Sequence, residues 1–281
     1  VTDHTPACSG SASGGQIVKP AKFEYERPST IDEATNLLGD EEKFNRVLAG
    51  GQSLGPMLNL RLAQPERLID ITNIPELKRA YRDGDYLTLG ACVTHSHLED
   101  GVAEGFANGM LESVANGISC RAVRNRGTVG GSIAHADPAA DWPVALLALG
   151  AEVTIAGPDN QRQLSLANFL VAPFETALRS GELLSAVHIP ALSNSAHWGY
   201  YKFCRKLGEF AETMAAVLLD PDRGISRAVI GATEARPTII DMEFTNDTAT
   251  TMIEENFPDA DWYQRQLHSV ALRRALNQIP Q

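Results

Sequence analysis

Two glycine-rich segments constrain this chain more than any other feature. The first, VLAGGQSLGP, covers residues 47–56, and the second, RNRGTVGGSIAHADPAAD, covers residues 124–141. Glycine permits backbone conformations closed to other residues and lets amide groups approach an oxygen atom closely. Successive amides that line a concavity can bind a phosphate, and Ser53, Thr128 and Ser132 add hydroxyls beside the glycines. The pattern favours a diphosphate held between two loops of separate subdomains. The alternative is that each glycine pair forms only a tight turn.

The composition limits what such a site can serve. The chain has 281 residues, enough for more than one domain. Its net charge of −11 argues against nucleic acid as a partner, since phosphate-backbone binding needs a concentrated cationic surface. No apolar run reaches membrane-spanning length, so no membrane insertion is expected. Neither glycine segment fits the Rossmann or P-loop pattern, so the common nucleotide fingerprints do not name the ligand.

Cysteine and histidine spacing speaks against a metal centre in this chain. Cys8, Cys92, Cys120 and Cys204 are far apart, whereas an iron–sulfur cluster or a zinc ribbon needs clustered thiols. The pairs HSH at 95–97 and HAD at 135–137 lack a third ligand nearby. We therefore expect reduced cysteines, as in a cytoplasmic protein, and no bound metal.

Periodicity predicts a mixture of helices and strands in the first part of the chain. Ser29 or Thr30 can cap a helix whose apolar face begins at Ile31. Short strands are predicted at FNRVLAGG and RLIDIT, and a hairpin that turns at DGD is followed by a helix entered at residues 94–96. Further helices are predicted at GFANGMLESVANGI, over residues 143–149 and at LANFLV, with a strand at AEVTIAG.

From about residue 173 the pattern changes to antiparallel strands. ELLSAVHIP, HWGYYKFCRK, ETMAAVLLD and GISRAVIGATE are apolar or alternating runs, and two amphipathic helices close the chain. The prediction is an α+β fold with a flexible tail over residues 1–19, a first domain over 20–175 and a C-terminal domain over 176–281. The first domain divides into subdomains of about 20–75 and 76–175.

AGGQSL together with RNRGTVGGSIAHADPAAD resembles the FAD-binding medium subunit of the molybdenum hydroxylases. This group includes the flavoprotein subunit of carbon monoxide dehydrogenase and is similar to the flavin domain of xanthine dehydrogenase. The resemblance runs from about Pro20 to the C-terminus and includes the terminal YQRQLHSVALRRAL. It implies a two-subdomain FAD-binding domain of the PCMH type, followed by a C-terminal antiparallel sheet with helices of the carbon monoxide dehydrogenase flavoprotein type.

The resemblance also implies positions for the cofactor contacts. The two loops would hold the diphosphate of FAD, Asp141 would bind a hydroxyl of its polyol, and Asp137 would instead form a turn. Lys202 would reach the flavin, with Lys206 or Tyr201 as alternatives, and Leu184 is preferred over Leu183 as an apolar contact. Arg124 and Arg126 either attract the diphosphate or form salt bridges. The full predicted set comprises Val47, Leu48, Ala49, Gly50, Gly51, Gln52, Ser53, Leu54, Ile118, Thr128, Val129, Gly130, Gly131, Ser132, Asp141, Leu184 and Lys202.

By resemblance, the chain is an electron-transfer subunit without substrate chemistry of its own. A large partner would carry the molybdenum cofactor and a small partner the [2Fe-2S] clusters, in a cytoplasmic dimer of heterotrimers. FAD would pass the electrons to NAD, dioxygen, a quinone or another carrier. Two alternatives are a stand-alone oxidase of the vanillyl-alcohol-oxidase type and a non-catalytic nucleotide-binding assembly protein. The oxidases often have a flavin-linked His beside the first loop, where this chain has Gln52.

Overall fold

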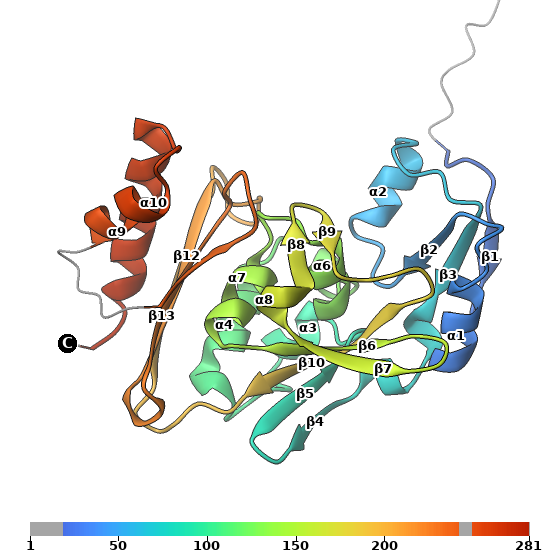
Figure 1. The fold of residues 1–281 in the computed structure, drawn as a ribbon, viewed down its shortest axis with the longest axis horizontal. Helices are drawn as coiled ribbons and strands as arrows, with labels where there is room; N and C mark the ends of the chain where they lie inside the picture. The colour runs from blue at the N-terminus through green and yellow to red at the C-terminus, as the bar shows by residue number, and fades with distance from the viewer. Residues whose placement is uncertain (1–18, 242–248, 281) are drawn as a thin grey trace, which may run out of the picture.

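The computed structural model describes residues 19–241 and 249–280, and it contains three main β-sheets arranged along its longest axis (Figure 1). The tail assigned to residues 1–19 lies outside the described residues except for Lys19. Mixed helices and sheets confirm the predicted α+β class. Within the described part of the chain, no helix combines the length and the apolar character that crossing a bilayer requires.

The first sheet holds the strand that leads into the first glycine loop. Its order is β1-β3-β2, and both outer strands run parallel to β3. The Thr30 hydroxyl accepts a hydrogen bond from the amide of Glu33 at 3.1 Å, so the predicted cap does start the first helix. The elements are β1 (Glu24–Glu26), α1 (Ile31–Leu38), β2 (Asn45–Leu48), α2 (Leu54–Asn59) and β3 (Arg67–Asp70).

The second sheet is antiparallel, with the order β4-β5-β10-β6-β7. Its strands are β4 (Ala80–Asp83), β5 (Tyr86–Gly90), β6 (Glu152–Ala156), β7 (Gln161–Ser165) and β10 (Leu183–Pro190). The hairpin predicted at DGD forms, and Gly84 at its turn has a φ of +58°. Side chains from this sheet and its helices form the main core, in which Trp142, Phe169 and Met110 are fully buried.

Six helices and one short hairpin accompany this second sheet. The helix predicted at LANFLV ends at Phe169, and the chain continues directly as a strand. The elements are α3 (His95–Glu99), α4 (Met110–Asn116), α5 (Arg121–Arg124), α6 (Val129–His135), α7 (Asp141–Ala148), α8 (Leu166–Phe169), β8 (Leu170–Ala172) and β9 (Glu175–Thr176). Four 3-10 turns are η1 (Ile71–Asn73), η2 (Glu76–Lys78), η3 (Ala107–Gly109) and η4 (Pro221–Arg223).

Strand β10 corrects the division of the chain expected at residue 175. The sequence placed it in the C-terminal domain, yet β10 pairs with β5 on one side and β6 on the other. It is therefore the central strand of the second sheet. Alternation identifies a strand but not its partners, which here lie about 30 and 100 residues away. We propose that the first domain extends through Pro190.

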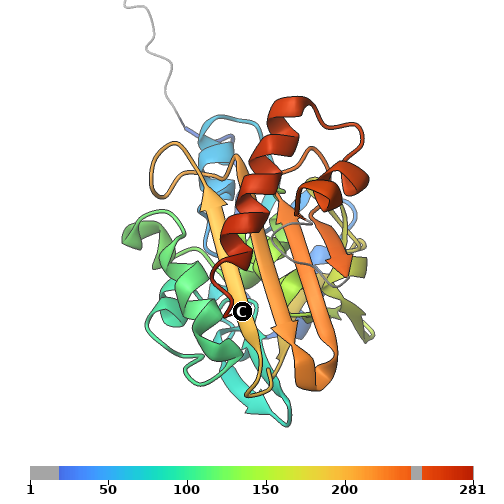
Figure 2. The same cartoon turned by 90° about the vertical axis from the view of Figure 1, so that its left-hand side faces the viewer.

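The third sheet is antiparallel, with the order β11-β12-β13-β14. One of its faces packs on α7 and the other on the two closing helices; Figure 2 shows α10 lying across that outer face. The elements are β11 (His197–Phe203), β12 (Thr213–Asp220), β13 (Ile225–Gly231), β14 (Thr238–Asp241), α9 (Ala249–Asn256) and α10 (Trp262–Leu276). The sheet thus stands directly beside the helix that begins with Asp141.

Candidate functional site

The two glycine loops meet in the structure. A Cβ atom built on Gly50 would lie 2.1 Å from the carbonyl oxygen of Arg126, so only glycine allows this contact. A Cβ atom on Gly131 would lie 3.7 Å from the Cβ of Ala49. The sequence indicated that two distant loops act together, and the backbone brings them into direct contact.

The first loop has consecutive amides that are available to a ligand. Gly51 has a φ of +70°, and the chain then turns into α2. The amides of residues 51–54 donate to no acceptor among the described residues, and Gln52 and Ser53 are exposed. The Gln52 side chain folds back onto the loop and donates to the Gly50 carbonyl at 3.0 Å. Unpaired amides in series suit an anionic oxygen, so this loop fits a phosphate.

The second loop differs from the expected amide cradle, because its amides already have protein acceptors. The Val129 amide donates to Val93 at 3.0 Å and the Gly130 amide to Ala91 at 3.1 Å. The Gly131 amide donates to the capping hydroxyl of Thr128 at 3.0 Å. The Ser132 hydroxyl of this loop remains available to a ligand, because it has no hydrogen-bond partner among the described residues. Its glycines serve close packing, since a Cβ on Gly130 would lie 2.4 Å from that of Ala91.

A buried histidine supports the second loop from beneath. His95 is 6% exposed, its amide donates to the Gly127 carbonyl at 2.9 Å, and its Nδ1 accepts a hydrogen bond from the indole of Trp142 at 2.9 Å. This arrangement assigns the proton of the neutral ring to Nε2. Burial, with a smaller effect from Arg124, lowers the pKa of His95 to about 4. The ring is therefore a neutral packing element at neutral pH.

Asp141 and Lys202, predicted separately as cofactor contacts, form an ion pair. Lys202 Nζ lies 3.0 Å from Oδ2 of Asp141, and the Tyr200 hydroxyl donates to Oδ1 at 2.7 Å. Burial raises the pKa of Asp141, while Lys202 and Tyr200 oppose that rise. The hydroxyl of Tyr200 also has a pKa well above its ordinary value, mainly because of burial. Sequence reasoning missed Tyr200, although its place two residues before Lys202 puts both side chains on one face of β11.

The alternatives to Lys202 lie elsewhere. Tyr201 faces the opposite side of β11, where its hydroxyl accepts a hydrogen bond from Arg274 of α10. Lys206 is exposed in the connection between β11 and β12. Of these three residues, Lys202 is the one whose side chain contacts another predicted site residue.

The two apolar candidates have different surroundings. Ile118 is partly exposed in the turn between α4 and α5 and packs against the main core. Leu184 is 4% exposed and belongs to that core, so its side chain leaves almost no surface for a cofactor. A contact between Leu184 and the cofactor stays a prediction.

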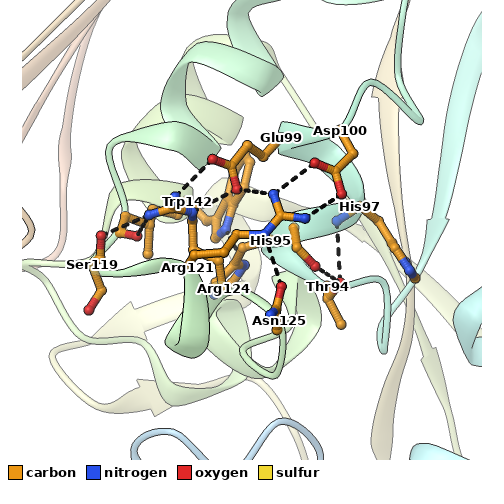
Figure 3. A network of polar contacts seen from close by, with 12 residues as sticks. Thr94, His95, His97, Glu99, Asp100, Ser119, Arg121, Arg124, Asn125 and Trp142 are labelled. Atoms are coloured by element: carbon orange, nitrogen blue, oxygen red, sulfur yellow. Dashed lines mark hydrogen bonds and ion pairs between the residues drawn. The ribbon is translucent and has the colours of Figure 1, made fainter.

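The remaining polar candidates have structural partners. Asp137 accepts a hydrogen bond from the Ala139 amide at 2.9 Å and forms the expected turn. Arg124 is buried and pairs with Glu99, whereas Arg126 is exposed (Figure 3 shows the Arg124 network). Among the described residues, no group of three or more His, Cys, Asp or Glu side chains is placed to hold a metal ion, and Cys92, Cys120 and Cys204 are free thiols.

Comparison with known proteins shows which family the chain belongs to and which cofactor that family binds. The model of the FAD binding domain in molybdopterin dehydrogenase matches residues 21–192. Nicotine 6-hydroxylase medium subunit of Paenarthrobacter nicotinovorans is 37% identical over 202 residues, which are 72% of this chain and 70% of the relative. Carbon monoxide dehydrogenase medium chain of Hydrogenophaga pseudoflava is 35% identical over 225 residues, which are 80% of this chain and 78% of the relative.

Solved structures agree with this match. Carbon monoxide dehydrogenase from Hydrogenophaga pseudoflava superposes with a TM-score of 0.84 at 30% identity, covering 92% of this chain and 98% of that chain. Quinoline 2-oxidoreductase from Pseudomonas putida 86 gives a TM-score of 0.82 at 31% identity, covering 93% and 98%. The free amides of the first loop and its contact with the second suit the diphosphate of the cofactor. The chain therefore belongs to the family of FAD-binding domains of the molybdopterin dehydrogenases, and it is the FAD-binding medium subunit of an oxidoreductase of the molybdenum hydroxylase type.

Proposed function

We propose that this chain carries electrons between a partner that oxidises substrate and an external acceptor. When FAD is bound, it supplies a centre that can take up electrons one at a time and release two. The observation that carries the proposal is the contact between the two glycine loops beside the unpaired amides of residues 51–54. That arrangement is suited to holding a dinucleotide.

The first loop would bind the diphosphate and the second would close over it. The amides of residues 51–54 and the hydroxyls of Ser53 and Ser132 are the donors without a partner among the described residues. The apolar side chains of Val47, Leu48 and Ala49 are partly exposed and would line the approach to the loop. Gly130 and Gly131 would act by their lack of side chains, and Thr128 by capping α6.

Lys202 and Asp141 would act on the flavin side of the site. A cation near the pyrimidine edge of the flavin stabilises negative charge on the ring. Because Lys202 is already paired with Asp141 at 3.0 Å, the carboxylate would orient the ammonium group and moderate its charge. Ile118 would provide an apolar surface beside the ring.

The partners follow from the names of the relatives. Similar proteins are called medium subunit, medium chain or a subunit of a dehydrogenase complex. We infer a large partner with the molybdenum cofactor and a small partner with [2Fe-2S] clusters, assembled as a dimer of heterotrimers. NAD, dioxygen, a quinone or another carrier would accept the electrons. The free thiols of the described cysteines are in keeping with a reducing, cytoplasmic setting.

The test begins with the visible spectrum of the purified chain and the chromophore released from it. We expect a two-banded flavin spectrum that yields FAD, and reduction of that flavin by substrate only when the partner subunits are added. Reduction by substrate in the isolated chain would favour the oxidase alternative. A flavin that the partners never reduce would favour the assembly protein.

The Gly131→Val variant should lose FAD, because its side chain would press on Thr128 Oγ1, 2.7 Å from the Cβ position. Full flavin content in that variant would count against the loop assignment.

A further inference from the structure

The guanidinium of Arg124 links the partly buried carboxylate of Glu99 to the backbone turn that carries Ile118. Arg124 Nε and one terminal nitrogen donate to the two carboxylate oxygens of Glu99, each at 2.8 Å. The other terminal nitrogen donates to the carbonyls of Ile118 at 2.9 Å and Ser119 at 2.8 Å. A planar guanidinium can make these fixed contacts together, whereas an ammonium group cannot.

The turn held by Arg124 needs such support. Ser119 has a φ of +44°, which lies in the left-handed region that favours glycine. Against it lies Gly208, which has a φ of +87° and whose Cβ position would be 3.2 Å from the Ser119 backbone. The turn is thus fixed between Arg124 on one side and the connection between β11 and β12 on the other. A shift of this turn would move Ile118 directly.

Arg121 provides a natural comparison on the same helix. It also contacts Glu99, at 2.6 Å, and reaches Asp100, but it makes no hydrogen bond to the turn among the described residues. Its side chain is 46% exposed, whereas that of Arg124 is 10% exposed. Figure 3 shows the two arginines approaching Glu99 from α5. The two residues share a charge partner, and only Arg124 reaches the Ile118–Ser119 backbone.

The same helix leads into the second glycine loop. The Gly127 amide donates to the Val123 carbonyl at 2.7 Å, and the Gly127 carbonyl accepts from the His95 amide. We propose that Arg124 is a positioning residue for the flavin, which sets the Ile118–Ser119 turn relative to the second glycine loop. This inference rests on the proposed function, since it assumes that FAD lies between these two segments.

The test compares Arg124→Lys with the matched control Arg121→Gln in the full chain. FAD affinity is measured by titration, the environment of the bound flavin by its visible circular dichroism, and folding by thermal unfolding without FAD. We expect Arg124→Lys to weaken FAD binding by about tenfold or more and to change the dichroism, since hydrogen bonds to charged groups are lost. Arg121→Gln should keep both properties.

A rescue variant separates positioning from charge. Adding Ser119→Gly to Arg124→Lys should restore much of the affinity and the dichroism, because glycine adopts a positive φ without the arginine. Wild-type FAD binding in Arg124→Lys would overturn the inference. Weak binding that Ser119→Gly does not improve would also overturn it, in favour of simple attraction between charge and diphosphate. If the wild-type chain does not bind FAD, both the inference and the proposed function are overturned.

Discussion

Lys202 Nζ lies 3.0 Å from Oδ2 of Asp141, which joins the first residue of α7 to the C-terminal end of β11. Both side chains are largely buried, with exposed fractions of 11% for Lys202 and 7% for Asp141. The pair spans 61 residues of sequence and links the domain that contains the glycine loops to the C-terminal sheet. It is therefore a structural connection as well as a candidate part of the flavin site.

Replacing Lys202 with Met should destabilise the protein strongly. A buried carboxylate left without its partner costs about 3–5 kcal/mol, so urea unfolding at pH 7 should show a loss of that order. Burial already raises the folded pKa of Asp141, and loss of the opposing charge of Lys202 would raise it further above the unfolded value. Compared with the wild type, the variant should consequently regain free energy of unfolding at pH values below the unfolded pKa of Asp141. It should lose that gain as the pH rises through the folded pKa of Asp141.

The double variant Asp141→Asn with Lys202→Met provides the control. Since it removes both charges, it should recover part of the lost free energy of unfolding and most of the altered pH dependence. If Lys202→Met unfolds at the same urea concentration as the wild type, the ion pair is not formed in solution.

Tyr200→Phe should cost about 1–3 kcal/mol of unfolding free energy, because Asp141 loses a buried donor at 2.7 Å. Tyr201→Phe is the matched control on the opposite face of β11. Its hydroxyl contacts Arg274, while the guanidinium stays 4.9 Å from the ring centroid in a contact that Phe retains. We expect a change below about 1 kcal/mol there. Equal losses in the two variants, measured by urea unfolding, would contradict the buried role of Tyr200.

Gly50→Ala should separate the two glycine loops, because the new methyl group would lie 2.1 Å from the Arg126 carbonyl oxygen. Overpacking of this kind costs about 1–3 kcal/mol, so FAD affinity should fall by about tenfold or more. Gly55→Ala, a few residues along in α2, meets nothing within 4 Å and should bind FAD as the wild type does. Titration of the two apo-proteins with FAD measures the two affinities. Similar affinities would show that contact between the loops is not needed for FAD binding.

Local sequence signals predicted much of the fold. Thr30 marks a helix start because its hydroxyl caps the amide three residues later, a relation contained within four residues. The same relation at Thr128 was missed, because residues 124–141 were interpreted as a loop although Val129–His135 is helical. The hairpin at Gly84 is equally local. Strand β10 was misplaced because its partners are set by tertiary pairing, which alternation does not encode.

The site was predictable in its parts but not in its connections. The sequence indicated that both glycine loops and Asp141 belong to one site, yet it suggested the same amide chemistry for both loops. The second loop uses its amides to hold segment 91–95, which becomes visible only once that segment is placed beside it. The sequence did not decide whether Arg124 binds the diphosphate or forms a salt bridge, because its partner Glu99 lies 25 residues away.

The neutral state of His95 should make the second loop sensitive to acid. Its folded pKa of about 4 lies below the ordinary value near 6.5, so the unfolded chain binds more protons between these two pH values. Stability from this residue is present above the unfolded pKa and is lost as the pH falls towards the folded one. Between pH 7 and pH 5 the loss should be about 2 kcal/mol.

In His95→Gln, an amide oxygen can still accept from Trp142 without titrating, so the difference in unfolding free energy between the two pH values should shrink by about that amount. Urea unfolding of both proteins at each pH measures this difference, and an unchanged pH dependence in the variant would mean that His95 is not buried in its neutral form.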